Sequence, residues 1–264
     1  MRKWELDLVK QESISEVKEK LATLQDVTDP YVAALRLDDR AGIQKLLASF
    51  DKRCAKIEAL KEKYQAMLRF ETPLLAQGHR FIAGIDEVGR GPLAGPVVAC
   101  AVILSPENPV YGLDDSKKLS AKKRGELFLE IRDKAVAIGI GVVNHDEIDR
   151  LNIYQASRQA MLMAVNDLAV PPSYLLLDAM LIDSPLPQEK IIKGDAQSVS
   201  IAAASIVAKE MRDDLMRECH QLYPHYGFDK NAGYGTKEHL AGLEKYGPCE
   251  IHRRSFRPVN EYFK

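Results

Sequence analysis

Residues 85–96 read Ile85-Asp86-Glu87-Val88-Gly89-Arg90-Gly91-Pro92-Leu93-Ala94-Gly95-Pro96 and lie between two strand-like stretches. Residues 80–85 and 97–104 are rich in apolar and β-branched side chains, which is typical of buried strands. The glycines and prolines between them predict a loop that joins the two strands. A dinucleotide-binding fingerprint would open a helix after its glycines, so a Rossmann-type oxidoreductase is the weaker alternative.

Strand-like and helix-like segments alternate through the rest of the chain. Further strands are predicted at residues 137–143, 174–177 and 190–193, and helices at residues 121–136, 153–168 and 198–222. This alternation predicts an α/β domain at residues 76–264 with a central mixed sheet.

The first 75 residues have a helical character. Gly42 is their only glycine, and charged residues alternate with Leu, Ile and Ala. Helix starts are predicted at Ser13, which can form a capping box with Glu16, and at Asp29-Pro30. A longer helix from Asp39 has apolar residues at intervals of seven, at Ile43, Phe50, Ile57 and Tyr64. We therefore predict a helical extension at residues 1–75, either a hairpin that packs on itself or on the main domain, or a coiled coil that binds a partner.

The composition is that of a folded globular protein. Of the 264 residues, 46% are hydrophobic and 28% are charged, close to the average for such proteins. No apolar run has signal-peptide or transmembrane length, so we expect a cytoplasmic protein with no membrane partner. The cysteines form no Cys-x-x-Cys pair, which indicates free thiols rather than a zinc site or a disulfide framework; they are Cys54, Cys100, Cys219 and Cys249.

The overall charge does not identify a nucleic-acid-binding protein. The formal net charge is −1, whereas such proteins often carry a basic excess. Basic residues gather locally at residues 117–124 and at residues 252–257, which include His252 and Arg253. Each cluster is interpreted as solvated surface charge or as a contact to nucleic acid. His225 and His239 are interpreted as polar loop or helix-surface residues without a catalytic role.

Acidic residues stand at the carboxyl ends of three predicted strands. Asp86 and Glu87 follow the first strand, Asp178 follows the strand at residues 174–177, and Asp195 follows the last strand. Ligands commonly bind at this end of an α/β sheet, so the four acids are expected to meet there, although each alone could be an N-cap or turn residue. Clustered carboxylates raise one another's pKa and need protons or a cation. Oxygen ligands without nearby His or Cys predict Mg²⁺ or Mn²⁺ as the cofactor.

The motif at residues 85–96 resembles the opening motif of ribonuclease HII, the bacterial type 2 ribonuclease H. Later segments agree with that family in order and spacing. They are Asp115-Ser116-Lys117-Lys118-Leu119, Leu177-Asp178-Ala179, Lys193-Gly194-Asp195, residues 200–209, and Gly233-Tyr234-Gly235-Thr236-Lys237-Glu238-His239. The resemblance extends over residues 80–257.

The resemblance implies a ribonuclease H-like fold and a metal-dependent endonuclease. Enzymes of this family hydrolyse the RNA strand of RNA·DNA hybrids and nick on the 5′ side of single ribonucleotides in duplex DNA, so both nucleic acids are the implied partners. The family's metal-binding acids correspond to Asp86, Glu87, Asp178 and Asp195, which implies catalysis with two metal ions. We expect a monomer that takes part in ribonucleotide excision repair.

The resemblance also implies a set of substrate contacts. They correspond to Gly89, Arg90, Gly91, Lys117, Lys118 and Tyr234. The Gly-Arg-Gly element reads the 2′-hydroxyl, the tyrosine stacks on the sugar of the following deoxynucleotide, and the lysines lie near phosphates. The 2′-hydroxyl is the group that distinguishes a ribonucleotide from DNA.

Two alternatives share much of this evidence. Ribonuclease HIII also has four acids and an N-terminal extension of its own, but the Gly-Arg-Gly element favours ribonuclease HII. A binding module for RNA·DNA that kept the acids for folding would show no metal-dependent cleavage. The extension at residues 1–75 is the main departure from the core family, and its role is left open.

Overall fold

The computed structural model describes residues 12–264, and its packing divides the chain into two units. One unit ends at Lys63, and the other comprises Tyr64–Lys264. The predicted division after residue 75 stays a prediction about the folding units. The start of the chain, interpreted above as lacking a signal peptide, lies outside the described residues. From residue 12 onwards, no helix has the length and apolar character needed to cross a membrane.

The first unit consists of helices α2 (Ile14–Thr23), α3 (Pro30–Leu35) and most of α4 (Ala41–Met67). Helix α2 begins with the predicted capping box, in which the Ser13 side chain accepts from the Glu16 backbone and the Glu16 side chain accepts from the Ser13 backbone. Apolar side chains of the three helices form one core: Val17, Leu21, Val32, Leu35, Ile43, Leu47 and Phe50. The predicted helices are confirmed, and this unit packs on itself.

The second unit is built around a five-stranded sheet. The strands are β1 (Ile82–Val88), β2 (Val97–Ile103), β3 (Ala137–Val143), β4 (Tyr174–Asp178) and β5 (Gln188–Ile191). Their order is β3-β2-β1-β4-β5. Strand β2 runs antiparallel to β1 and β3, whereas β4 runs parallel to β1 and β5. The predicted mixed sheet and the α/β class are confirmed.

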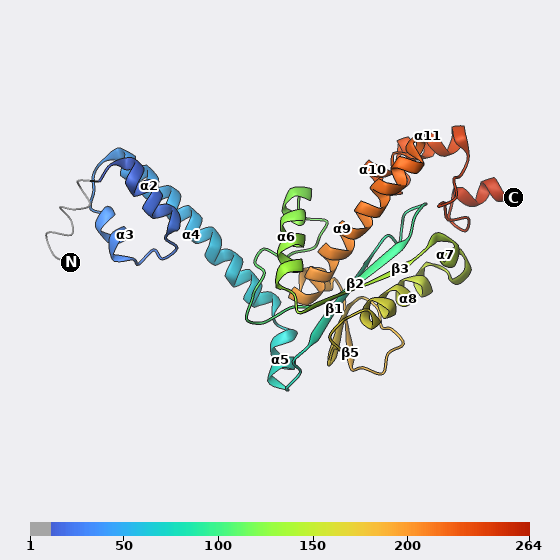
Figure 1. Cartoon of the computed structure of the whole chain (residues 1–264), viewed down its shortest axis with the longest axis horizontal. Coiled ribbons are helices and arrows are strands. Elements are labelled where there is room, and N and C mark those ends of the chain that lie inside the picture. The colour runs from blue at the N-terminus through green and yellow to red at the C-terminus, as the bar shows by residue number, and fades with distance from the viewer. Residues whose placement is uncertain (1–11) are drawn as a thin grey trace. The chain divides into compact units, whose positions relative to one another are not determined.

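Helices cover both faces of this sheet. The helices of this unit are α5 (Glu71–Ala76), α6 (Ala121–Lys134), α7 (His145–Leu151), α8 (Ile153–Asn166), α9 (Val199–Leu222), α10 (Phe228–Asn231) and α11 (Lys237–Tyr246), with 3₁₀ turns η1 (Gly194–Ala196), η2 (Pro224–Tyr226) and η3 (Val259–Phe263). Figure 1 shows α8 on one face of the sheet and α6 and α9 on the other. The central strands are buried on both faces, which explains their continuous apolar sequences. Cys100 packs in the core on the α9 side, and the cysteines are free thiols, as predicted.

Strand β1 continues beyond its predicted end at Ile85. Its pairing with β2 includes Asp86 opposite Cys100 and Val88 opposite Val98. Asp86 and Glu87 therefore lie within the strand, where the hydrogen-bonded ladder holds their backbone. Strand β5 instead ends at Ile191, earlier than predicted, because Lys193 adopts a left-handed conformation with φ of 56°. Asp195 consequently lies in turn η1 after the strand.

Helix α9 packs directly against β1. A Cβ atom on Gly84 would lie 2.0 Å from the backbone carbon of Ser200, so only glycine allows this approach. The helix is lined at this place by small buried residues, Ala202, Ala203 and Ala204. The small-residue segment therefore forms a closely packed support for β1 and its acids.

Candidate active site

The four predicted acids meet at one rim of the sheet. Strands β1 and β4 run parallel with Ile85 opposite Leu177, so Asp86 and Asp178 follow at adjacent positions. Turn η1 brings Asp195 to the same rim, because the backbone N–H of Gly194 donates to Asp178 Oδ1 at 2.7 Å. The convergence that the strand ends predicted is therefore present.

Burial and mutual repulsion dominate the electrostatics of the two acids on β1. Asp86 is 6% exposed, and burial together with the charge of Asp178 raises its pKa to about 7. Burial and the charge of Asp86 raise the pKa of Glu87 well above its ordinary value, although Arg90 opposes this shift. The charged forms of both carboxyl groups are therefore disfavoured unless a cation compensates their charge.

The other two acids experience the same forces in a milder form. Burial raises the pKa of Asp178, while the hydrogen bond from Gly194 and the charge of Lys117 partly oppose it. Burial and the charges of Asp115 and Asp178 raise the pKa of Asp195. All four predicted acids therefore lie in an environment that disfavours their charged forms.

A fifth acid, Asp115, also belongs to this cluster. Its charge acts on Asp195 and on Asp178 and raises the pKa of both carboxyl groups. Asp115 is two residues before Lys117 in the segment Asp115-Ser116-Lys117-Lys118-Leu119, and this proximity to a predicted substrate contact could have indicated a place in the site. Its own carboxyl group was missed because it follows no predicted strand.

The lysines of the same motif behave differently from each other. Burial lowers the pKa of Lys117, but the charges of Asp86, Asp115 and Asp195 outweigh this effect and raise it overall. Lys117 therefore serves as a counter-charge at the acids. Lys118 is exposed, and its Nζ lies 3.4 Å from Asp114 Oδ1. The charges of the acid cluster thus act on Lys117, whereas the ion-pair partner of Lys118 is Asp114.

The carboxylates fit a hard divalent cation such as Mg²⁺ or Mn²⁺. Glu87 Oε2 is buried and has no hydrogen-bond partner within residues 12–264, so a cation would satisfy it. Across those residues, no three His, Cys, Asp or Glu side chains are arranged to hold a metal ion by themselves. An open site of this kind suits Mg²⁺, which usually keeps several waters and binds to a few carboxylates together with substrate phosphates.

The Gly-Arg-Gly element lies between the acids and Tyr234. Gly89 has φ of 94°, and a Cβ atom there would lie 2.1 Å from Arg212 Nε, so the position requires glycine. Arg90 Nη1 lies 3.4 Å from Glu87 Oε1. A Cβ atom on Gly91 would lie 3.4 Å from Cε1 of Tyr234, so the loop backbone and the tyrosine ring face each other. The Tyr234 side chain remains available, since the residue is 44% exposed.

Several residues interpreted as surface groups are buried beneath this loop. Arg253 and His239 are 0% exposed, and His252 is 1% exposed. The interpretation of residues 252–257 as solvated surface charge is therefore wrong for His252 and Arg253. The interpretation of His239 as a surface residue is wrong as well. His225 is exposed, as expected. Sequence spacing gave no signal of this burial, because it depends on contacts with the distant Gly-Arg-Gly loop.

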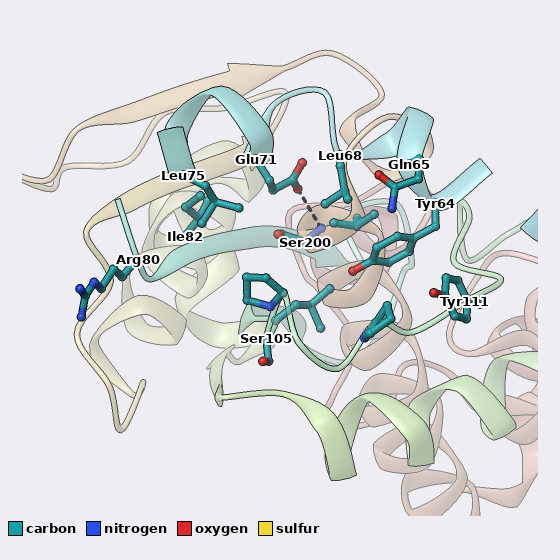
Figure 2. Close-up of a pocket in the computed structure, with 14 residues that line it drawn as sticks. Tyr64, Gln65, Leu68, Glu71, Leu75, Arg80, Ile82, Ser105, Tyr111 and Ser200 are labelled. Atoms are coloured by element: carbon teal, nitrogen blue, oxygen red, sulfur yellow. Dashed lines mark hydrogen bonds between the residues drawn. The ribbon is translucent and has the colours of Figure 1, made fainter. Parts of the chain in front are cut away.

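A separate cavity of about 270 Å³ opens at the other end of β1, beside Ile82 (Figure 2). The Glu71 carboxyl group on its wall accepts from Ser198 Oγ at 2.5 Å and from Ser200 N at 3.1 Å. Apolar side chains such as Leu68 and Leu104 make up much of the remaining wall. None of the predicted site residues lines this cavity, so it is distinct from the acid cluster.

Comparison with known proteins identifies the relatives of this chain. The family model described as Ribonuclease HII matches residues 83–259, and the one described as Ribonuclease HII N-terminal domain matches residues 13–75. A ribonuclease HII from Enterococcus faecalis is 56% identical over 250 residues, which cover 95% of this chain and 98% of that protein.

Solved structures show the same architecture. The ribonuclease H2 from Pyrococcus horikoshii OT3 is 25% identical, with a TM-score of 0.60 over 69% of this chain and 96% of that chain. Bst-RNase HIII, solved in complex with Mn²⁺, is 17% identical, with a TM-score of 0.52 over 69% of each chain. The predicted ribonuclease H-like fold is confirmed.

Proposed function

Because the chain belongs to the ribonuclease HII family and is a ribonuclease H-type endonuclease, we propose that it hydrolyses the RNA strand of RNA·DNA hybrids and also nicks duplex DNA on the 5′ side of single ribonucleotides. Its proposed catalytic and metal-binding residues are Asp86, Glu87, Asp178 and Asp195. The observation that carries the proposal is the convergence of these four carboxyl groups at one rim, each with a raised pKa.

The raised pKa values explain why divalent cations belong to the mechanism. Two bound Mg²⁺ or Mn²⁺ ions would activate the attacking water and stabilise the leaving 3′-oxygen. The chain contributes the negative charge that holds such ions, and the Gly194 N–H fixes the orientation of the Asp178 carboxylate. Lys117 limits the net negative charge of the cluster and thereby reduces the repulsion of an approaching phosphate.

Selection of a ribonucleotide is assigned to the pair formed by Gly91 and Tyr234. A Cβ atom on Gly91 would already lie 3.4 Å from the Tyr234 ring, so the absence of a side chain leaves the loop backbone bare beside the tyrosine. The exposed Tyr234 ring is available to stack on the neighbouring sugar. The 2′-hydroxyl would then meet backbone groups at a place where DNA presents no hydroxyl.

Phosphate contacts are assigned to Lys117, Lys118 and Arg90. Lys118 and Arg90 are exposed, and their present partners, Asp114 and Glu87, lie 3.4 Å away. Both ion pairs are long and their cations are exposed, so the cations can exchange these partners for phosphate oxygens. Monomeric action, a cytoplasmic location and a role in ribonucleotide excision repair remain predictions.

The decisive experiment uses a DNA duplex with one embedded ribonucleotide. We expect a single nick on its 5′ side in Mg²⁺ or Mn²⁺ and no nick after chelation. A matched all-DNA duplex should stay intact. Cleavage of an RNA·DNA hybrid without any cleavage of the single-ribonucleotide duplex would contradict the finer part of the proposal and leave the hybrid activity standing.

A further inference from the structure

Three segments that are distant in the sequence meet beneath the proposed ribose site. They are the Gly-Arg-Gly loop (residues 89–96), the tyrosine loop (residues 231–236) and the C-terminal segment (residues 249–253). Backbone hydrogen bonds connect them: Leu93 N donates to Gly233 O at 2.8 Å, Gly95 N to Ile251 O at 2.9 Å, and Arg253 N to Leu93 O at 2.8 Å. The geometry of each loop therefore depends on the other two segments.

Arg253 holds the Gly-Arg-Gly loop by its carbonyl groups. Its guanidinium donates from Nη2 to Gly89 O at 2.6 Å, from Nη1 to Arg90 O at 3.0 Å and from Nε to Gly95 O at 2.9 Å. The side chain is fully buried, and burial lowers its pKa to about 9. These hydrogen bonds all go to carbonyl groups, so a buried charge is used to fix loop geometry rather than to form an ion pair.

Arg212 connects the same loop to the tyrosine loop. It donates to Ala94 O at 3.2 Å and to Pro96 O at 2.9 Å in the first loop, and to Ala232 O at 2.8 Å in the second. The two buried arginines together contact both sides of the proposed ribose site. Neither residue reaches the surface, so neither can contact substrate directly.

A chain of hydrogen bonds through two histidines fixes the carbonyl group of Tyr234. Cys249 N donates to His252 Nδ1 at 2.9 Å, so this nitrogen is the acceptor of the ring. The proton of neutral His252 is then on Nε2, which lies 2.9 Å from Nε2 of His239. His239 therefore carries its proton on Nδ1 and donates to Tyr234 O at 2.9 Å. One backbone donor thus determines the tautomers of both rings.

We propose that Arg253 and the His252–His239 pair are positioning residues that hold the Gly-Arg-Gly loop and Tyr234 at the spacing needed to select a ribonucleotide. This inference rests on the proposed function of Gly91 and Tyr234. Arg253 acts through the carbonyl groups of Gly89 and Arg90, and His239 acts through the carbonyl group of Tyr234. None of these hydrogen bonds goes to a carboxyl group of the acids on β1 and β4, so we expect metal binding to be independent of the network.

The test compares two substrates in the same enzyme preparation. A single-ribonucleotide duplex has a deoxynucleotide on the 3′ side of the ribonucleotide for Tyr234 to stack on, whereas an all-RNA tract paired with DNA has a further ribonucleotide there. A variant that only lost stability would contain less active enzyme and would lower kcat/KM equally for both. The ratio of the two kcat/KM values therefore reports positioning and is independent of the folded fraction.

Two pairs of variants separate the contacts. His239→Asn keeps a donor near the position of Nδ1, whereas His239→Leu removes it. Arg253→Lys keeps the charge and some carbonyl contacts, whereas Arg253→Met removes both. The matched controls are His225→Leu, at an exposed histidine, and Arg158→Met, at an arginine that donates to Leu181 O at 2.9 Å.

We expect His239→Leu to lower the ratio of kcat/KM on the single-ribonucleotide duplex to kcat/KM on the all-RNA tract by about tenfold. The loss of one hydrogen bond changes a free energy by about 1 kcal/mol, which corresponds to a rate change of this order. His239→Asn should restore most of it, and Arg253→Lys should lie between wild type and Arg253→Met. The controls should keep the wild-type ratio. If Arg253→Met does not fold, the two His239 variants and Arg253→Lys still test the proposal. An unchanged ratio in both His239→Leu and Arg253→Lys would overturn the proposal.

Hydrogen exchange provides a readout that does not depend on activity. The amides of Leu93 and Gly95 should exchange about tenfold faster in His239→Leu and Arg253→Lys than in wild type or the controls. A wild type that fails to nick the single-ribonucleotide duplex would refute the proposed function. The exchange rates would then still decide whether these residues position the loop, and unchanged rates would overturn that claim.

Discussion

Asp86 combines a position within a strand, 6% exposure and neighbours of the same charge. We expect a cation to relieve this repulsion in the active enzyme and a proton to relieve it in the metal-free protein. We therefore expect the same side chain to be required for activity and unfavourable for stability. These two consequences can be measured separately.

Asp86→Asn should abolish cleavage of both substrates while the protein stays folded, because the amide keeps the shape of the side chain but removes its charge. We expect kcat/KM to fall by at least about a thousandfold at saturating Mg²⁺, and Asp178→Asn should behave alike. Asp183→Asn, at an exposed aspartate, is the control. Turnover close to wild type in either variant would remove that residue from the metal site.

Asp86→Asn should also stabilise the metal-free protein at alkaline pH. The folded-state pKa of Asp86 is about 7, above its ordinary value of 3.8, so the folded state binds the proton more tightly. That contribution is present at low pH and is lost as the pH rises through 7. We expect the variant to gain about 1–3 kcal/mol in free energy of unfolding at pH 8, and less at pH 5. Urea denaturation with a chelator measures both, and equal stability at pH 8 would contradict the assignment.

Tyr234→Ala should impair cleavage at an isolated ribonucleotide and leave metal binding intact. Stacking on an aromatic ring contributes roughly 1–3 kcal/mol, so kcat/KM should fall about ten- to hundredfold if this energy is expressed in the transition state. Tyr234→Phe should lose less, because the ring remains. An alanine variant as fast as wild type would remove Tyr234 from the site.

At the scale of elements, helix α9 supports the acids from below, and its N-terminus is held by a residue of α5. The Glu71 carboxyl group accepts from the N-cap side chain of Ser198 and from Ser200 N. Burial raises the pKa of Glu71, so this group resists ionisation. The contact therefore depends on acceptor oxygens more than on charge.

Glu71→Gln should consequently keep the stability of the protein within about 1 kcal/mol, since the amide oxygen still accepts from Ser198 or Ser200. Glu71→Ala should lower the free energy of unfolding by about 1–3 kcal/mol, because buried donors at the helix N-terminus lose their acceptor. Urea denaturation of the two variants compares them directly. A loss in Glu71→Gln as large as in Glu71→Ala would show that the charge matters.

At the scale of the whole molecule, the end of the helical extension belongs by packing to the catalytic unit. Tyr64 and Met67 pack in the core beside α9, and Leu74 packs with Ile82 of β1. The family model of the N-terminal domain continues to residue 75 and includes these side chains. The packing therefore assigns residues 64–75 to the catalytic unit, whereas the family model assigns them to the N-terminal domain.

Two truncated chains distinguish these boundaries. A chain that starts at Tyr64 should fold and retain metal-dependent cleavage, because the acids and the core remain complete. A chain that starts at residue 76 loses several buried side chains worth about 1.5–3 kcal/mol each, so its thermal unfolding should begin at a clearly lower temperature. Equal stability of the two chains would assign residues 64–75 to the extension, as the sequence predicted.

The alternating elements, the mixed sheet and the acids that follow its strands could all be predicted from the order of residues alone. These features are local, since apolar periodicity and turn residues report how a short segment is buried. The order of motifs also identified the family before any contact was known. The exact ends of β1 and β5 were wrong, because pairing with β2 extends one strand and the left-handed Lys193 ends the other.

Only the tertiary structure decided that Asp115 joins the acids and that Arg253 and His239 are buried beneath the Gly-Arg-Gly loop. In sequence these are polar residues in polar surroundings, and nothing nearby distinguishes them from surface groups. Their partners lie far away along the chain, as with Arg253 and Gly89. Burial of a polar side chain is settled by such distant acceptors, because only the folded chain supplies the hydrogen bonds that replace water.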